Sequence, residues 1–119
     1  MSSDPVYADL HTHTHCSDGT LPPDRLVRRA AERGVEALAV TDHDTTAGLK
    51  DARRAAHAHG IRLVTGVELS TEVDGHAVHL LGYGFAPGHP VLADYLASFT
   101  ARRRERLRRM VQRLADQGI

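Results

Sequence analysis

Residues 9–19, Asp9-Leu10-His11-Thr12-His13-Thr14-His15-Cys16-Ser17-Asp18-Gly19, combine alternating histidines with a tight polar turn. They follow an apolar run, Val6-Tyr7-Ala8, that predicts a short strand. Alternate side chains of a strand share a face, so His11 and His13 are expected to point the same way. The turn at Asp18 can bring a carboxylate back over the strand end. Taken alone, this stretch favours a polar loop that happens to be rich in histidine. Further candidate ligands at the ends of later strands favour a divalent metal site instead.

The bulk composition is that of a single soluble domain. At 119 residues, with 41% apolar and 25% charged residues, the chain can build at most one modest core. No apolar run has the length of a membrane span, and Met-Ser-Ser-Asp-Pro at the N-terminus lacks the pattern of a signal peptide. The single cysteine, Cys16, excludes an intrachain disulfide and fits a reducing compartment. We therefore expect a cytoplasmic protein without a membrane partner.

Charge is divided unevenly along the chain, although the formal net charge is zero. Residues 1–100 carry eight Lys and Arg against thirteen Asp and Glu, a balance of −5. Residues 101–119 carry seven Arg against two acids, a balance of +5. The chain also holds nine histidines, which is many for its length. An acidic, histidine-rich body suits cations, and a basic C-terminal helix suits anions.

Apolar periodicity predicts alternating strands and helices. A helix is expected to start at Leu21-Pro22-Pro23-Asp24 and to end at Gly34. Short apolar runs typical of buried strands follow at Ala37–Val40 and Ile61–Glu68. Between them an alanine-rich helix is expected over Ala47–His59, with Gly60 at its end. Strand–helix–strand–helix–strand with short links argues for a parallel α/β sheet.

The second half predicts a hairpin and a long helix. Asp74-Gly75 separates the extended runs 69–73 and 76–81, which is a strong hairpin signal. Residues 83–90 form a Gly/Pro loop, and the pattern from Val91 to Gln117 is helical.

Polar residues recur at the carboxyl ends of the predicted strands, the edge where parallel α/β folds build their sites. His43 follows the second strand and Glu68 ends the third. An unpaired carboxylate beside that apolar run would cost roughly several kcal/mol of desolvation, which a bound cation removes. His79 alternates with apolar neighbours and is expected to point inward. Each residue alone has an ordinary structural explanation, but together with His11 and His13 they favour a metal site.

These residues resemble the first motifs of the PHP (polymerase and histidinol phosphatase) superfamily. The matching motifs are Asp-Leu-His11-x-His13 with Ser-Asp18-Gly, Thr-Asp-His43-Asp-Thr, Gly-Val-Glu68 and His79-Leu-Leu-Gly-Tyr. Within it the chain is similar to the branch of 3′,5′-nucleoside bisphosphate phosphatases and 5′-to-3′ exoribonucleases. The resemblance implies an α/β fold, a distorted TIM-like (β/α)7 barrel with up to three divalent metal ions, which could be manganese, zinc, iron or magnesium. It implies that His11 and His13 bind one ion, that Glu68 bridges it to a second held by His79, and that Asp18 and His43 hold a third.

Length is the departure from that family, whose complete members are more than about twice as long. We therefore expect an N-terminal part of the barrel at residues 4–89 and the start of an arginine-rich helical insertion at residues 90–119. The last ligands of the family would lie beyond Ile119, so the chain by itself should be poorly active. An unfinished sheet would also expose an apolar edge and invite self-association.

Further residues are expected around the metal ligands. Asp9 would orient His11, and Asp42 and Asp44 would orient the His43 between them. Arg103 heads an apolar stripe at helical spacing, which directs it toward the body of the protein. The resemblance implies that Arg102, Arg103 and Arg106 bind a substrate phosphate, and the alternatives are a solvated basic face or general affinity for nucleic acid.

The function that this pattern predicts is metal-dependent hydrolysis of phosphate esters, with nucleotide 3′,5′-bisphosphates or RNA 5′ ends as substrates. Clustered metal ions lower the pKa of a bound water and neutralise phosphoryl charge, so no catalytic residue beyond that water is needed. One alternative is a C–N bond hydrolase on a similar barrel site. The other is a metal-stabilised binding module of the same fold without activity.

Overall fold

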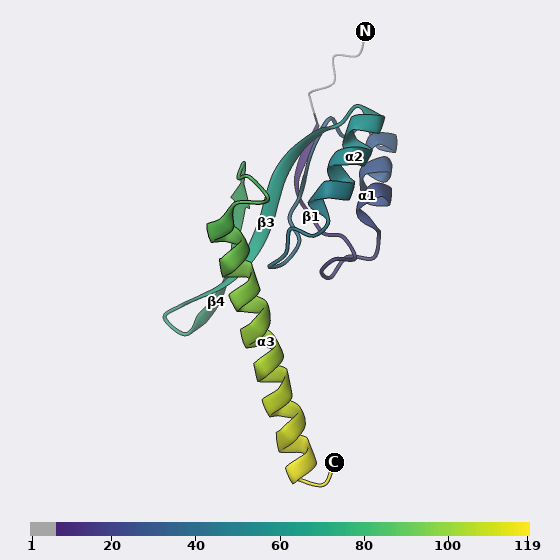
Figure 1. Ribbon diagram of the computed structural model, residues 1–119. Coiled ribbons are helices and arrows are strands. Elements are labelled where there is room, and N and C mark those ends of the chain that lie inside the picture. Colours follow the sequence, from purple (N-terminus) through teal and green to yellow (C-terminus); the bar gives the residue numbers. More distant parts are fainter. Residues whose placement is uncertain (1–6) are drawn as a thin grey trace. The chain divides into compact units, whose positions relative to one another are not determined.

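The computed structural model describes residues 7–119, and contacts divide them into two compact units between Pro87 and Gly88, each described here by itself (Figure 1). The predicted domain start at residue 4 and the predicted strand residue Val6 lie outside the described residues. No helix among residues 7–119 is long and apolar enough to cross a membrane.

The first unit is a four-stranded mixed sheet with two helices. Its strands lie in the order β1-β2-β3-β4, with the first three parallel and β4 antiparallel to β3. Figure 1 shows α1 and α2 packed side by side against the sheet. The elements are β1 (Ala8–Thr12), α1 (Pro23–Glu32), β2 (Ala37–Val40), α2 (Leu49–His59), β3 (Arg62–Val73) and β4 (His76–Tyr83).

The first strand lies later in the chain than predicted. It spans Ala8–Thr12 rather than Val6–Ala8, so His11 lies within it and His13 just beyond it. Backbone pairing outweighs the polar character of this segment. The Thr12 hydroxyl donates to Ala39 O at 2.7 Å, and the Thr41 N–H donates to Thr12 O at 2.8 Å. These bonds hold β1 against β2 up to the residue that precedes His13.

The third strand is one continuous strand, whereas the sequence predicted a strand ending at Glu68 and a separate extended run after it. Its first residues pair with β2, and from Gly66 onward it pairs with β4 up to Val73↔His76. Because the partner changes from one edge of β3 to the other, the strand needs no break at Glu68. The predicted Asp74-Gly75 hairpin turn is confirmed, with φ values of 50° and 78° at its two residues, as a type I′ turn requires.

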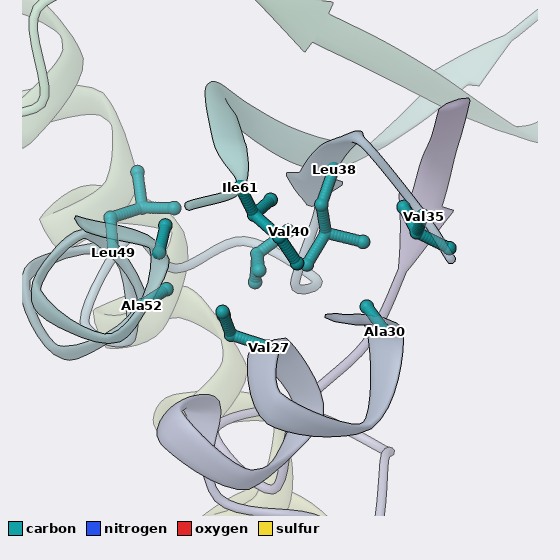
Figure 2. Close-up of a cluster of buried hydrophobic side chains, with 9 residues drawn as sticks. Val27, Ala30, Val35, Leu38, Val40, Leu49, Ala52 and Ile61 are labelled. Carbon is teal, nitrogen blue, oxygen red and sulfur yellow. The ribbon is translucent and has the colours of Figure 1, made fainter. Parts of the chain in front are cut away.

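Both predicted helices of the sheet unit are confirmed, with small shifts at their ends. Pro23 occupies the first helical position of α1, and Gly34 beyond its end has a φ of 79°. The second helix begins at Leu49, two residues after the predicted start, and ends at Gly60 in the left-handed conformation. Between these helices and the sheet lies the hydrophobic core of Figure 2, formed by Val27, Ala30, Val35, Leu38, Val40, Leu49, Ala52, Ala56 and Ile61.

The second unit is dominated by a single helix, α3 (Pro90–Asp116), one residue offset from its predicted bounds at each end. His89 caps its N-terminus, where the Nδ1 atom accepts a hydrogen bond from Val91 N–H at 3.2 Å. All of its residues are exposed or half-buried, including Arg103 and the apolar stripe of Leu107, Met110 and Leu114. The orientation of Arg103 toward the body therefore stays a prediction.

Candidate metal centre

Glu68 lies at the centre of the histidine cluster, near the middle of β3, and is only 3% exposed. Both hydrogen-bonding groups of its backbone bind the segment that follows β2. The Glu68 N–H donates to Asp42 O at 3.1 Å, and the Asp44 N–H donates to Glu68 O at 3.0 Å. His43 thereby lies opposite Glu68 in a parallel bridge. The sheet therefore fixes the backbone of Glu68 independently of the contacts that its carboxylate makes.

Four imidazoles contact the two oxygens of this carboxylate in pairs. Oε1 contacts His11 Nε2 and lies 3.4 Å from His13 Nε2. Oε2 lies 3.2 Å from His43 Nδ1 and 2.8 Å from His79 Nδ1. Because each oxygen faces a different pair of histidines, this carboxylate has the geometry of a bridge between two ions.

Asp18 lies on the other side of two of these rings. Its Oδ1 is 3.5 Å from His13 Nδ1, and its Oδ2 is 3.1 Å from His43 Nε2. The rings of His13 and His43 stack with centroids 4.5 Å apart and planes 13° from parallel. The side chain of Asp18 is 65% exposed, whereas that of Glu68 is only 5% exposed. The cluster therefore has one buried and one solvent-facing carboxylate.

The structure brings all six predicted ligand residues together. Their donor atoms form three overlapping groups, each with ligand atoms within 4.8 Å of one another: His11/His13/Glu68, His13/Asp18/His43 and His43/Glu68/His79. The donor set of imidazole nitrogens and carboxylate oxygens suits zinc, manganese or iron. His13 Nδ1 is moreover buried without a hydrogen-bond partner among the described residues, and Asp18 Oδ1 lies 3.5 Å from it. The residues present fit a divalent metal ion.

The electrostatics of Glu68 agree with a site for cations. Burial acts to raise its pKa, but the hydrogen bond with His11 and the positive charges of His43, His11 and His13 together outweigh burial. The net result is a pKa below the ordinary value of 4.5. Glu68 is therefore held in its charged form, and a metal ion bound by the neighbouring imidazoles would supply a stronger positive charge.

The aspartates predicted to orient the histidines bind backbone and hydroxyl groups instead. Among the described residues neither Asp42 nor Asp44 forms a hydrogen bond with the imidazole of His43. Asp42 binds the loop after β1, and Asp44 binds Ser70 of β3. Asp9 accepts a hydrogen bond from the backbone N–H of His11 at 3.3 Å. Orientation of the ligands thus acts through the main chain.

Two further contacts at the site were missed from the sequence. A Cβ on Gly66 would lie 2.7 Å from Thr41 Cγ2 and 2.9 Å from Val40 O, so this position accepts only glycine. The ring of Tyr83 lies across Gly66, and its hydroxyl donates to Leu10 O at 2.6 Å. Tyr83 was assigned to a loop, although an isolated glycine inside a strand signals a close approach of this kind.

This arrangement of a mixed sheet with four histidines around a buried glutamate defines a candidate metal-site protein of the α/β class. Residues 9–116 match the model of the PHP domain, and the chain belongs to the PHP domain family. Its four-stranded sheet with two helices corresponds to an N-terminal part of the PHP barrel.

Relatives by sequence include two named enzymes. The chain is 45% identical over 122 residues to the 5′-3′ exoribonuclease Rnm of Salmonella typhimurium, covering 98% of the chain and 42% of that protein. It is 45% identical over 111 residues to the 3′,5′-nucleoside bisphosphate phosphatase of Chromobacterium violaceum, covering 93% of the chain and 39% of that protein. The chain thus spans about two fifths of the length of these relatives.

Solved structures agree with this relationship. An amidohydrolase from Chromobacterium violaceum with bound sulfate and no metal superposes with a TM-score of 0.84 and 44% identity, over 96% of the chain and 40% of that protein. A protein from Bifidobacterium adolescentis described as a metal-dependent phosphoesterase also gives 0.84, with 35% identity, over 95% of the chain and 40% of that protein.

Proposed function

We propose that the protein carrying this chain hydrolyses phosphate esters of nucleotides with the help of divalent metal ions. The observation that carries the proposal is the buried Glu68 carboxylate with its two oxygens facing separate pairs of histidines. The names of the relatives support a phosphoric ester as the substrate. Divalent ions at such a cluster supply a nucleophilic water near neutral pH and neutralise charge on phosphoryl oxygens.

We infer that each shared histidine would bind a single ion. A neutral imidazole offers one nitrogen to a metal and donates a proton from the other. His13 Nε2 faces Glu68 beside His11, so its Nδ1–H would donate to Asp18. His43 would bind through Nε2 beside Asp18 and donate from Nδ1 to Glu68. Glu68 would then join the His11/His13 subsite to a subsite at His79, and the exposed Asp18 would border the solvent side where substrate enters.

For the substrate we propose a nucleoside 3′,5′-bisphosphate or an RNA 5′ end, bound in part by the arginines that begin the basic part of α3. Arg102 lies 5.9 Å from the ring centroid of Phe99, a cation–π distance, so its guanidinium is already partly occupied. Arg103 and Arg106 are exposed and offer bidentate donors that match a phosphate. Manganese, zinc, iron or magnesium would serve as the metal, and we propose a cytoplasmic location.

Phosphate release tests the proposal on protein stripped with EDTA and reloaded with Mn²⁺. The substrates are adenosine 3′,5′-bisphosphate, a 5′-phosphorylated RNA oligonucleotide and a panel of amides. We expect release of phosphate or nucleotide only after metal is restored, and no cleavage of the amides. Amide cleavage without phosphate release would instead assign a C–N hydrolase. Metal binding without either activity, in a protein as long as the relatives, would assign a binding module.

A further inference from the structure

The tripeptide Asp42-His43-Asp44 makes the same unusual contact twice, once on each side of the histidine. Each aspartate accepts two hydrogen bonds from a single residue elsewhere in the chain, one from its backbone N–H and one from its hydroxyl. We propose that these two carboxylates are separate positioning residues, Asp42 for the candidate ligands His13 and Asp18 beside His43, and Asp44 for the candidate ligands Glu68 and His79. The inference rests on the metal site of the proposed function.

Asp42 fixes the loop that carries two of the candidate ligands. Its Oδ1 accepts from Thr14 N–H at 2.6 Å and from Ser17 Oγ at 2.7 Å, and its Oδ2 accepts from Thr14 Oγ1 at 2.7 Å. Asp42 is 2% exposed and Thr14 is fully buried, so water does not compete for these bonds. Residues 14–17 lie between His13 and Asp18, and the clamp therefore determines where both of them stand relative to His43.

Asp44 fixes β3 beyond the bridging glutamate. Its Oδ1 accepts from Ser70 N–H at 2.8 Å, and its Oδ2 accepts from Ser70 Oγ at 2.7 Å. Asp44 is 6% exposed and has a φ of 55°, a left-handed conformation that costs free energy in most residues. Ser70 follows Glu68 by two positions and pairs with His79 across the β3–β4 ladder. The clamp therefore fixes the strand segment from which Glu68 and His79 extend.

A carboxylate suits both positions, because it accepts charge-assisted hydrogen bonds from all of these groups at once. Every group that faces Asp42 or Asp44 in these contacts is a donor, and an ionised carboxylate accepts without donating. An asparagine of the same shape would place its NH₂ against a hydroxyl, which would have to turn from donor to acceptor, so the charge-assisted bonds would be replaced by weaker neutral ones. Asparagine tolerates the left-handed conformation, so Asp44→Asn removes the acceptor without new backbone strain. Asp74, exposed and at a φ of 50° in the hairpin turn, offers a matched control for the same substitution.

Hydrogen exchange of two amides tests the clamps without any metal. In the metal-free chain we expect Asp42→Asn to speed exchange of the Thr14 amide about tenfold or more while the Ser70 amide keeps its rate. Asp44→Asn should give the reverse, and Asp74→Asn should change neither. Equal acceleration of both amides in either variant, or no acceleration in both, would overturn the proposal, because separate clamps cannot give those patterns.

A Zn²⁺ titration followed on the histidine ring resonances by NMR then tests the link to the metal subsites. Asp42→Asn should lower the apparent Zn²⁺ affinity reported by the His13 and His43 resonances about tenfold or more and leave that reported by His79 unchanged. Asp44→Asn should mainly lower the apparent Zn²⁺ affinity reported by His79. A parallel loss of all responses would mean a general structural role and would contradict separate positioning. No response in the wild-type chain would count against the metal site itself, while the exchange pattern would still decide the clamps.

Milder variants cover the case in which an aspartate substitution prevents folding. Ser17→Ala removes one of the three bonds to Asp42, and Ser70→Ala removes one of the two bonds to Asp44. The proposal then expects a smaller effect of the same kind, confined to the Zn²⁺ response of His13 and His43 for Ser17→Ala and of His79 for Ser70→Ala. An effect on the opposite subsite would contradict it.

Discussion

Replacing Glu68 by glutamine is the most direct test of the metal centre. The substitution keeps the size of the side chain but removes its charge and one of its two metal-binding oxygens. Because Oε1 faces His11 and His13 while Oε2 faces His43 and His79, Glu68 belongs to two of the three ligand groups. The substitution should therefore weaken the binding of more than one ion.

The expected magnitude follows from the role of the residue as a ligand. Changes around a ligand typically weaken metal binding about 10- to 100-fold, and loss of a bridging carboxylate should exceed that range. We expect the content of Mn²⁺ or Zn²⁺ after dialysis to fall by at least about one ion per chain relative to wild type. A ligand present at about 100 times its Kd contributes about 2.7 kcal/mol to the free energy of unfolding, and the variant should lose most of that contribution.

Metal analysis by atomic emission and thermal unfolding with and without metal measure the two quantities. Glu72→Gln is the control, because Glu72 lies on the same strand, is exposed and belongs to none of the ligand groups found in residues 7–119. Metal content and metal-dependent stabilisation that stay at the wild-type level in Glu68→Gln would refute the role of Glu68 as a bridge. An equal loss in Glu72→Gln would point to general electrostatics of the strand.

Three other predictions concern pH, the sheet and the arginines. The pKa of Glu68 in the folded chain is below its ordinary value of 4.5. The contribution of Glu68 to the free energy of unfolding is therefore present above pH 4.5 and is lost as the pH falls through the pKa of the folded chain. Denaturation in EDTA between about pH 3 and 6 should thus show a steeper loss of stability for wild type than for Glu68→Gln, and equal slopes would contradict the shift. Tyr83→Phe removes the hydrogen bond to Leu10 O and should lower the free energy of unfolding by about 0.5–1 kcal/mol in urea denaturation; an unchanged midpoint would mean that water replaces the bond fully. Arg103→Ala in the full-length protein should lower kcat/KM for a bisphosphate by roughly ten- to hundredfold, about 1.5–3 kcal/mol, and affect a monophosphate much less. Arg109, paired with Glu105 at 3.4 Å, is the control, and equal effects on both substrates or in both variants would exclude a specific phosphate contact.

The candidate ligands could be predicted from the sequence because their placement follows from chain order. Short apolar runs separated by helices predict parallel strands, and the carboxyl ends of parallel strands share one edge. His43 and Glu68 follow two such runs, and the structure places them opposite each other in a parallel bridge. The alternation around His79 predicted an inward side chain; its Nδ1 does lie 2.8 Å from Glu68, but the side chain is 54% exposed. Local pattern and topology were sufficient for these contacts.

The supporting contacts could not be predicted in the same way, because they join residues without any shared pattern. Thr14 and Asp42 are 28 positions apart, and Tyr83 and Leu10 are 73 apart. A threonine in a polar loop and a tyrosine beside a Gly/Pro segment give no periodic signal of their partners. The continuous course of β3 was missed for a related reason. The pairing partner of β3 changes from β2 to β4 at a position that depends on where those strands end, and the sequence of β3 has no pattern that signals this change.

Counting donor atoms shows how far this chain can satisfy a cluster of metal ions. Four imidazoles offer one nitrogen each and two carboxylates offer two oxygens each, which gives at most eight donors. Three ions with about four ligands each would need about twelve. The difference must come from water, from phosphate oxygens of a substrate or from residues outside these 119. Positions filled by water or substrate would make the centre catalytic rather than structural, because a structural centre closes its coordination with protein ligands. The solvent-facing Asp18 and the buried Glu68 would thus have different parts in the proposed cluster: Glu68, shielded from water, would fix the ions to the sheet, and Asp18 would border the side open to solvent.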